Sequence, residues 1–256
     1  MEMPKNTFKK ALREGRQQIG LWCTMPDPYL TEILSTAGFD WLLLDAEHSP
    51  TDIRSMMVQL QVGRAGPSAL VVRPPVNDTV LIKQYLDIGA QTLLLPMIQS
   101  AEEARAAVSA MRYPPAGVRG VAGMTRATRF GRAENYLQRA EEELCLLVQV
   151  ETRGALEHIE AIAAVDGVDG IFVGPSDLAA SLGHRGDPFH PEVVEAVESA
   201  IARITAAGKP AGILTPNVEF AQRCMDLGTR FTAVGNDMAV LLNGAEALAQ
   251  KFAGKP

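Results

Sequence analysis

The sequence predicts an α/β protein built as a single (β/α)8 TIM barrel that spans residues 1–256. Eight short apolar runs occur along the chain, and an amphipathic helical pattern follows each of them. The length matches one such barrel, which typically has about 250 residues. A doubly wound open sheet is the main rival. It is disfavoured because no G-x-G-x-x-G motif opens the first strand-to-helix turn and eight units match the closed count.

The predicted strands are rich in Leu, Ile and Val. Most are apolar throughout, as parallel strands covered on both faces must be. We expect them at residues 19–25, 41–46, 68–74, 92–97, 144–151, 170–175, 210–215 and 230–236.

The predicted helices alternate with these runs at residues 29–37, 51–63, 79–89, 101–112, 154–165, 191–208, 218–228 and 238–252. Several end at a glycine, where a left-handed C-cap is expected, namely Gly38, Gly63, Gly89, Gly208 and Gly228. A further helix at about 5–16 is expected to cover the bottom of the barrel. Residues 113–143 form an irregular stretch, much longer than a usual connection of ~2–6 residues, and such loops usually carry function.

The composition excludes several classes of partner. The chain has 24 Lys and Arg against 30 Asp and Glu, a formal net charge of -6, so no global positive field would attract nucleic acid or anionic lipid. No apolar stretch reaches the ~18 residues of a membrane span. Three widely spaced cysteines, Cys23, Cys145 and Cys224, indicate neither a disulfide framework nor a zinc site, and we expect core thiols in a cytoplasmic protein.

In barrel enzymes the active site lies at the carboxyl ends of the strands, so the polar residues that end the apolar runs are the candidates. Side-chain alternation places Gln149 and Glu151 on one side of their strand and Val150 on the other. The candidates are Asp45, Glu47 and His48 after strand two, Arg73 after strand three, Gln149 and Glu151 after strand five, and Gly174, Pro175, Ser176 and Asp177 after strand six.

Two of these residues are candidate metal ligands. Glu151 and Asp177 come from adjacent strand ends and offer hard oxygen ligands, which suits Mg²⁺ or Mn²⁺. An incomplete protein shell would leave positions for water and a chelating substrate. The alternative is that each carboxylate caps a helix or pairs with an arginine.

Two other residues are candidates for acid–base and charge chemistry. His48 could act as a general base oriented by Asp45, and the alternative is a surface histidine. Arg73 could stabilise negative charge that develops on a substrate oxygen. Its alternative is a structural role as the partner of Asp45 or Glu47.

The start of the helix after strand six is a candidate carboxylate site. Ser176 and Asp177 follow Gly174 and Pro175 directly, so free backbone N–H groups would face the mouth of the barrel. The alternative is ordinary helix capping. A Schiff-base mechanism is not expected, because no strand run or its carboxyl end contains a lysine.

Long segments of the chain resemble the HpcH/HpaI family of class II, metal-dependent pyruvate aldolases. They are AGFDWLLLDAEHSP, LIKQYLDIGAQTLLLPMIQSAEEA, RYPPAGVRG, GRAENY, LCLLVQVET and GIFVGPSDLAASLG. The resemblance implies a barrel of the phosphoenolpyruvate/pyruvate type, usually a hexamer. It also implies reversible cleavage of 4-hydroxy-2-oxo acids, such as 4-hydroxy-2-oxoheptanedioate from aromatic catabolism, to pyruvate or a related 2-oxo acid and an aldehyde.

The resemblance also implies roles for individual residues. His48 is similar to the family's base, Arg73 to its transition-state stabiliser, and Glu151 and Asp177 to its ligands for Mg²⁺, Mn²⁺ or Co²⁺. Gln149 and Ser176 resemble substrate contacts, and the family has an acceptor-specificity residue where Leu214 or its neighbours stand. In the family another residue raises the basicity of this histidine, and that residue matches Asp87. Asp87 is expected at a helix end on the wrong face of its own barrel, so it would reach His48 only by an unusual path or from a neighbouring subunit.

Two other functions remain open. One is a related barrel lyase that acts on acyl-CoA or phosphoenolpyruvate-type substrates. The other is a non-catalytic barrel that binds small acids. Loss of activity on chelation and its recovery with a divalent ion would exclude the non-catalytic reading.

Overall fold

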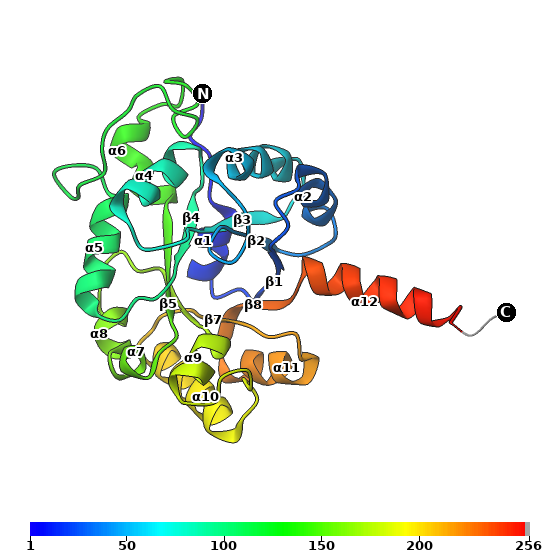
Figure 1. The fold of residues 1–256 in the computed structure, drawn as a ribbon. Helices are drawn as coiled ribbons and strands as arrows, with labels where there is room; N and C mark the ends of the chain where they lie inside the picture. Colours follow the sequence, from blue (N-terminus) through cyan, green and yellow to red (C-terminus); the bar gives the residue numbers. More distant parts are fainter. Residues whose placement is uncertain (254–256) are drawn as a thin grey trace.

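A computed structural model describes residues 1–253, and residues 254–256 of the predicted domain lie outside the described residues. Eight parallel strands form a closed barrel in the order of the sequence, surrounded by helices (Figure 1). This confirms the predicted (β/α)8 fold. The strands are β1 (Gln18–Cys23), β2 (Trp41–Asp45), β3 (Ala69–Arg73), β4 (Thr92–Leu95), β5 (Cys145–Val150), β6 (Gly170–Val173), β7 (Ala211–Leu214) and β8 (Thr229–Asn236).

The helices lie outside the barrel except for the first. They are α1 (Thr7–Arg13), α2 (Pro28–Ser35), α3 (Ile53–Val62), α4 (Thr79–Asp87), α5 (Ala101–Met111), α6 (Tyr136–Glu143), α7 (Arg153–Glu157), α8 (Ile159–Ala163), α9 (Pro175–Ser181), α10 (Pro191–Ala206), α11 (Val218–Leu227) and α12 (Asp237–Gln250), with a 3₁₀ turn at Gly63–Ala65. None of the helices in the described range is long and apolar enough to cross a membrane.

Two apolar cores flank the strands. The larger core fills the space between the barrel and its outer helices. The smaller core fills the barrel interior, where Phe8 and Leu12 of α1 pack beside Trp41 and Phe231. Helix α1 therefore lies against the amino-terminal end of the barrel, opposite the strand ends that carry the polar candidates.

Strand register brings the polar strand ends to one rim. Asp45 of β2 lies directly beside Arg73 of β3, and Gln149 of β5 lies beside Phe172 of β6. Because all eight strands are parallel, their carboxyl ends open on the same face.

Three local predictions were wrong. Gly63 has a right-handed φ of -62°, because a 3₁₀ turn continues from α3 instead of a left-handed cap. The helix predicted at 154–165 divides into α7 and α8 at His158, whose φ of -107° breaks the helix. The irregular stretch 113–143 contains α6 at its end.

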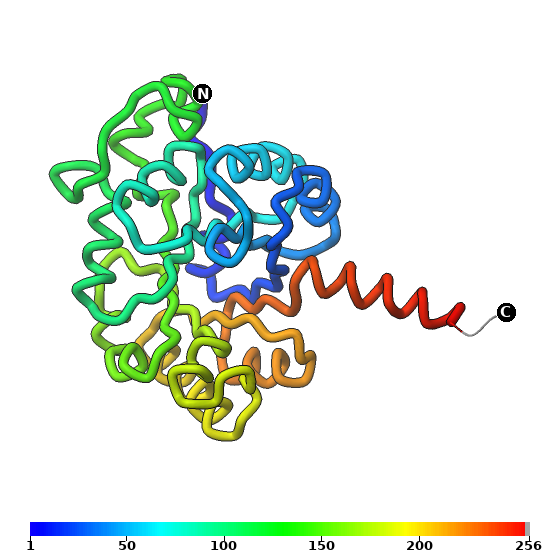
Figure 2. The backbone as a smooth tube through the Cα atoms, in the orientation of Figure 1, coloured from blue at the N-terminus to red at the C-terminus, as the bar shows by residue number. Residues whose placement is uncertain are grey.

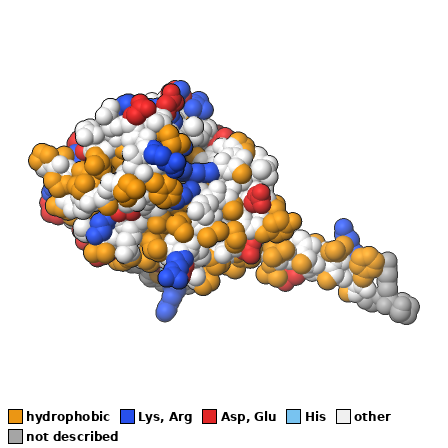
Figure 3. All heavy atoms as spheres, turned by 90° about the horizontal axis from the view of Figure 1, so that it is seen from above, with side chains coloured by type: hydrophobic (Ala, Val, Ile, Leu, Met, Phe, Trp, Pro, Cys, Tyr) orange, Lys and Arg blue, Asp and Glu red, His pale blue; other side chains and the backbone are white. Residues whose placement is uncertain are grey.

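Helix α12 extends away from the barrel (Figures 1 and 2). Its first residue, Asp237, is buried and accepts hydrogen bonds from the backbone N–H groups of Thr24 and Met25, which fixes the base of the helix. Apolar side chains line the exposed remainder (Figure 3). They include Met238, Val240, Leu241, Leu242 and Leu248, each more than half exposed.

Candidate active site

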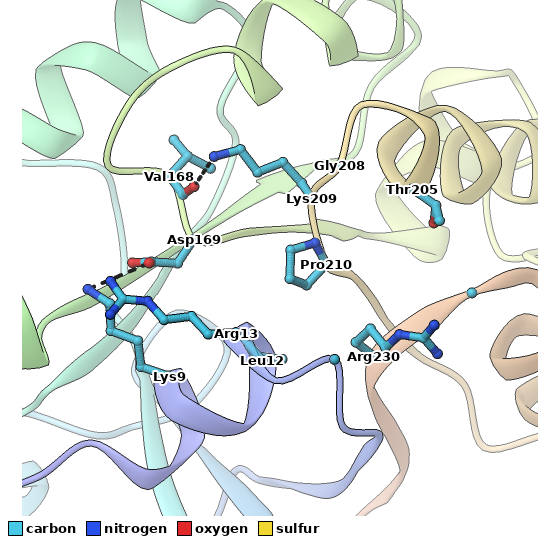
Figure 4. Close-up of a pocket in the computed structure, with 12 residues that line it drawn as sticks. Lys9, Leu12, Arg13, Val168, Asp169, Thr205, Gly208, Lys209, Pro210 and Arg230 are labelled. Atoms are coloured by element: carbon cyan, nitrogen blue, oxygen red, sulfur yellow. Dashed lines mark hydrogen bonds and ion pairs between the residues drawn. The ribbon is translucent and has the colours of Figure 1, made fainter.

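A cavity of about 410 Å³ lies at the amino-terminal face of the barrel, between α1 and the turns before β6, β7 and β8 (Figure 4). Lys9, Arg13, Lys209 and Arg230 line it beside Asp169. None of the residues that end the strands reaches this cavity, so it is not the site of the predicted chemistry.

The opposite, carboxyl-terminal face holds a cavity of about 510 Å³. Eight of the predicted site residues line it together, contributed by the ends of five strands. The lining consists of Trp22, His48, Arg73, Gln149, Phe172, Gly174, Pro175, Ser176, Asp177, Pro188, Phe189, Leu214, Thr215, Pro216, Phe220 and Asn236.

Arg73 is held between two carboxylates. Its Nε and Nη2 donate to Oδ1 and Oδ2 of Asp45 at 2.8 and 2.6 Å, and its Nη1 lies 2.8 Å from Oε2 of Glu47. The guanidinium carbon lies 4.8 Å from the ring centroid of Trp22, whose Nε1 also donates to Asp45. The structural pairing considered as an alternative for Arg73 is present, while one face of the same side chain lines the cavity.

Asp45 is almost fully buried and stays ionised because of these partners. Burial by itself would raise its pKa, but the hydrogen bonds and charge of Arg73 outweigh burial and lower the pKa below its usual value. The backbone N–H of Glu47 also donates to Asp45. No hydrogen bond joins Asp45 to His48 among residues 1–253, so Asp45 positions Arg73 in this structure and not the imidazole.

Glu47 belongs to the site, although the sequence predicted for it only a place at a strand end and a possible pairing with Arg73. Its carboxylate contacts Arg73, and burial raises its pKa, as do the nearby charges of Asp45 and Asp177. The sequence signal was its place after β2, between Asp45 and His48.

Glu151 is a buried carboxylate that accepts two hydrogen bonds. Its Oε1 accepts a bond of 2.8 Å from the backbone N–H of Met97, and its Oε2 accepts one from Nε2 of Gln149. Met97 presents its N–H from a left-handed backbone with φ of 56°, which is uncommon for a residue with a side chain. Burial raises the pKa of Glu151 to about 7, and the nearby Asp177 and Glu47 charges add to that effect.

The turn from β6 into α9 passes close to Glu151. A Cβ atom on Gly174 would lie 2.5 Å from Glu151 Oε2 and 3.0 Å from Gln149 Nε2, so the backbone can approach the carboxylate only at a glycine. Ser176 and Asp177 are exposed in the first turn of α9. The backbone N–H groups of these two residues make no hydrogen bond within the described chain.

These residues fit a divalent cation. The charge of Asp177 adds to the raised pKa of both Glu151 and Glu47, and Glu47 adds to that of Glu151. Among the described residues that line the cavity, Arg73 is the one arginine, and it is already engaged with two carboxylates. The Oε1 of Gln149 is buried without a hydrogen-bond partner in the described chain. An excess of oxygen donors over cations is the environment that Mg²⁺ or Mn²⁺ prefers.

A second possible metal group lies in the loop between α9 and α10. His184, His190 and Glu192 have ligand atoms within 4.8 Å of one another. The two imidazole rings stack with centroids 3.5 Å apart and planes 13° apart, so their in-plane nitrogen lone pairs do not converge on one ion.

Asp87 lies away from this cavity. It ends α4, and its Oδ1 accepts a 2.7 Å hydrogen bond from Nη2 of Arg119, a fully buried residue of the irregular stretch. Its backbone carbonyl accepts a hydrogen bond from Ala127 of the same stretch. Within one chain, Asp87 therefore serves the packing of residues 113–143 and does not contact His48.

Comparisons with known proteins agree with this geometry. Residues 18–244 match the family model described as HpcH/HpaI aldolase/citrate lyase. A pyruvate aldolase from Rhizobium etli is 61% identical over 99% of this chain and 100% of its own length. A 4-hydroxy-2-oxo-heptane-1,7-dioate aldolase from Salmonella heidelberg is 54% identical over 97% of this chain and 95% of its own.

One solved structure extends the comparison to the fold. A HpcH/HpaI aldolase/citrate lyase family protein from Burkholderia cenocepacia superimposes with a TM-score of 0.94 at 40% identity, covering 96% of this chain and 99% of that chain. The similarity therefore includes the whole barrel together with its strand ends.

Proposed function

The chain belongs to the HpcH/HpaI aldolase/citrate lyase family and is an aldolase that forms pyruvate, and from this premise we propose that it is a metal-dependent enzyme that cleaves 4-hydroxy-2-oxo acids at the carboxyl-terminal cavity. The observation that carries the proposal is the grouping of three carboxylates at one place: Asp177 lines the cavity, and Glu151 and Glu47 lie directly behind the lining residues Gln149 and Arg73, the one arginine among the described lining residues.

In this proposal Glu151 and Asp177 hold Mg²⁺, Mn²⁺ or Co²⁺, with Glu47 close by. When bound, the ion supplies a Lewis acid that polarises the ketone of the 2-oxo acid. The free backbone N–H groups of Ser176 and Asp177, behind Gly174 and Pro175, bind the substrate carboxylate. Gln149 contacts the substrate with its Oε1, which has no hydrogen-bond partner within residues 1–253.

His48 and Arg73 carry out the proton and charge steps. In the cleavage direction His48 removes the proton of the 4-hydroxyl group, and the C3–C4 bond breaks to give an aldehyde and the enolate of pyruvate. The protonated imidazole then returns the proton to C3 of the enolate, which gives pyruvate. In the synthetic direction the exposed imidazole removes a methyl proton of pyruvate. Arg73, fixed by Asp45, presents positive charge to the oxygen that becomes negative. Asp87 takes part only if it approaches His48 from another subunit.

The proposal includes a homo-oligomer, the hexamer that the sequence resemblance implies. An isolated 14-residue helix that exposes apolar side chains is marginally stable in water, so α12 needs a covering surface. A second copy of this chain is the occupant we propose. We also place the protein in the cytoplasm, in keeping with three cysteines that are free and buried.

A coupled pyruvate-release assay over a panel of 4-hydroxy-2-oxo acids, with and without EDTA, tests the proposal. We expect pyruvate release that EDTA abolishes and that Mg²⁺, Mn²⁺ or Co²⁺ restores. Activity that persists after complete chelation would overturn the metal requirement. Turnover of acyl-CoA esters or phosphoenolpyruvate instead would favour the related-lyase alternative.

A further inference from the structure

One side of the cavity has an apolar wall, which we assign to the aldehyde half of the substrate. Phe189, from the loop between α9 and α10, contacts Phe220 of α11 with ring centroids 5.9 Å apart and planes at 80°. Leu214 at the end of β7 packs against the barrel-interior core, and Pro188 and Pro216 complete this side. All five residues follow β6 or β7 in the chain and line the same cavity as Arg73 and His48.

Contacts at both ends of its loop hold Phe189 in this wall. The stacked rings of His184 and His190 bring the two ends together, and Nε2 of His184 lies 2.8 Å from Oε2 of Glu192. The backbone N–H of His190 donates to Asp187 across the same turn. Phe189 is nevertheless 45% exposed, so its side chain is available to a ligand.

The cavity has no cation free for a second substrate carboxylate. Among its described lining residues, Arg73 is the one Lys or Arg, and it is bound to Asp45 and Glu47. A carboxylate against the apolar wall would lose its hydration without gaining a partner. A carboxylate turned toward Arg73 would meet a guanidinium whose charge is already balanced by Asp45 and Glu47. Arg185 belongs to the same loop as Phe189 but does not line the cavity.

We propose that this enzyme acts on 4-hydroxy-2-oxo acids whose aldehyde half is uncharged, and that Phe189 enforces this selection against a distal carboxylate. The inference rests on the proposed function and concerns its acceptor side. The names of the two relatives leave this point open, since one specifies a heptane-1,7-dioate and the other specifies only pyruvate.

The test compares two substrates of equal chain length, 4-hydroxy-2-oxoheptanoate and 4-hydroxy-2-oxoheptanedioate, which differ only by the C7 carboxylate. For the wild-type protein we expect kcat/KM for the monoacid to exceed that for the diacid by about tenfold or more. Equal values, or preference for the diacid, would overturn the inference.

The variant Phe189→Arg supplies the missing cation and should shift that ratio toward the diacid by about tenfold. Because the ratio is measured within one preparation, it does not depend on the fraction of folded enzyme. Phe130→Arg is the matched control: Phe130 is 55% exposed and does not line the cavity, so the ratio should stay at the wild-type value. A ratio unchanged in Phe189→Arg would remove Phe189 from the selection.

Exchange of pyruvate methyl protons in D₂O separates this inference from the proposed function, because it needs no aldehyde. Exchange in the wild type that EDTA abolishes, combined with preference for the diacid, overturns the acceptor inference alone. Absence of exchange in the metal-loaded wild type overturns the proposed function and the inference with it.

Discussion

Arg73 donates two parallel hydrogen bonds to Asp45, its in-register neighbour on the adjacent strand, while a third nitrogen pairs with Glu47. The fork geometry of a guanidinium allows this, and a lysine ammonium cannot reproduce it. The position of the Arg73 guanidinium therefore depends on these partners as well as on its own strand.

Arg73→Lys should lower both stability and turnover. It keeps the charge but removes at least one charge-assisted hydrogen bond, which costs about 1.5–3 kcal/mol of unfolding free energy. The positive charge would no longer be held in place against the negative charge that develops on the substrate oxygen, so kcat should fall about 100-fold. Urea unfolding and pyruvate release measure the two effects.

Arg139→Lys is the matched control, because Arg139 forms a similar fork with Glu142 on the exposed face of α6. A change within about 0.5 kcal/mol is expected there. Equal losses of stability in both variants would show that burial of the Arg73 pair contributes nothing.

The ionised state of Asp45 should make the protein sensitive to acid. Because the folded pKa is lowered, the stability contributed by this carboxylate is present above its unfolded pKa of about 3.9 and is lost as the pH falls through the folded pKa. Urea unfolding at about pH 5.5 and about pH 3 should show a smaller loss in Asp45→Asn than in the wild type. Parallel losses in the two proteins would assign the acid sensitivity to other groups.

Glu151→Gln should separate ion binding from folding. The amide oxygen can still accept the hydrogen bond from Met97, so the fold should remain, while the charge that faces Asp177 and Glu47 is gone. We expect no heat of Mn²⁺ binding in calorimetry and a loss of activity of about 1000-fold or more.

Glu103→Gln controls for the hydrogen bond itself, since Glu103 likewise accepts a backbone N–H, that of Gln99, outside the cavity. This variant should bind Mn²⁺ as the wild type does. If Glu151→Gln also retained Mn²⁺ binding, the assignment of Glu151 as a ligand would be wrong.

The three thiols should be inert in the folded protein. Cys23, Cys145 and Cys224 are buried, and burial raises the pKa of each thiol, that of Cys224 to about 12. Because the thiolate is the reactive form, a disulfide reagent at about pH 8 should not label the native protein. Guanidinium should expose all three. Rapid labelling of one cysteine before unfolding would contradict its burial.

The sequence was sufficient for the barrel because both patterns that define it are local. Runs such as Leu42–Leu44 are apolar on both faces, and amphipathic helices follow them. The break at His158 was not predictable in this way, since its apolar neighbours continue the helical period. Gly63 shows the same limit, because a glycine permits a left-handed cap but does not require one.

Residue type, strand position and the family resemblance predicted eight of the residues that line the candidate cavity, but they did not predict which of the side chains pair with one another. Asp45 was expected to orient His48, and its oxygens instead bind Arg73, Trp22 and the backbone of Glu47. Such pairings depend on register between strands that are distant in sequence. The apolar wall at Phe189 was missed for a related reason, since its loop reaches the cavity only after α9 and α10 have packed.

Leu241→Glu tests the covering of α12 by a second copy of the chain. Leu241 is 62% exposed on a helix whose first residue, Asp237, is anchored to the barrel, so a carboxylate there disrupts an apolar contact between copies without entering any core of the single chain. Light scattering should show a smaller assembly than the wild type forms, and the fall in mass should be accompanied by loss of helical circular dichroism as α12 frays. Gln250→Glu adds the same charge on the same helix without removing an apolar side chain, and it should assemble as the wild type does. A wild-type protein that is monomeric at every concentration, with α12 still protected from proteolysis, would show that the helix needs no second copy.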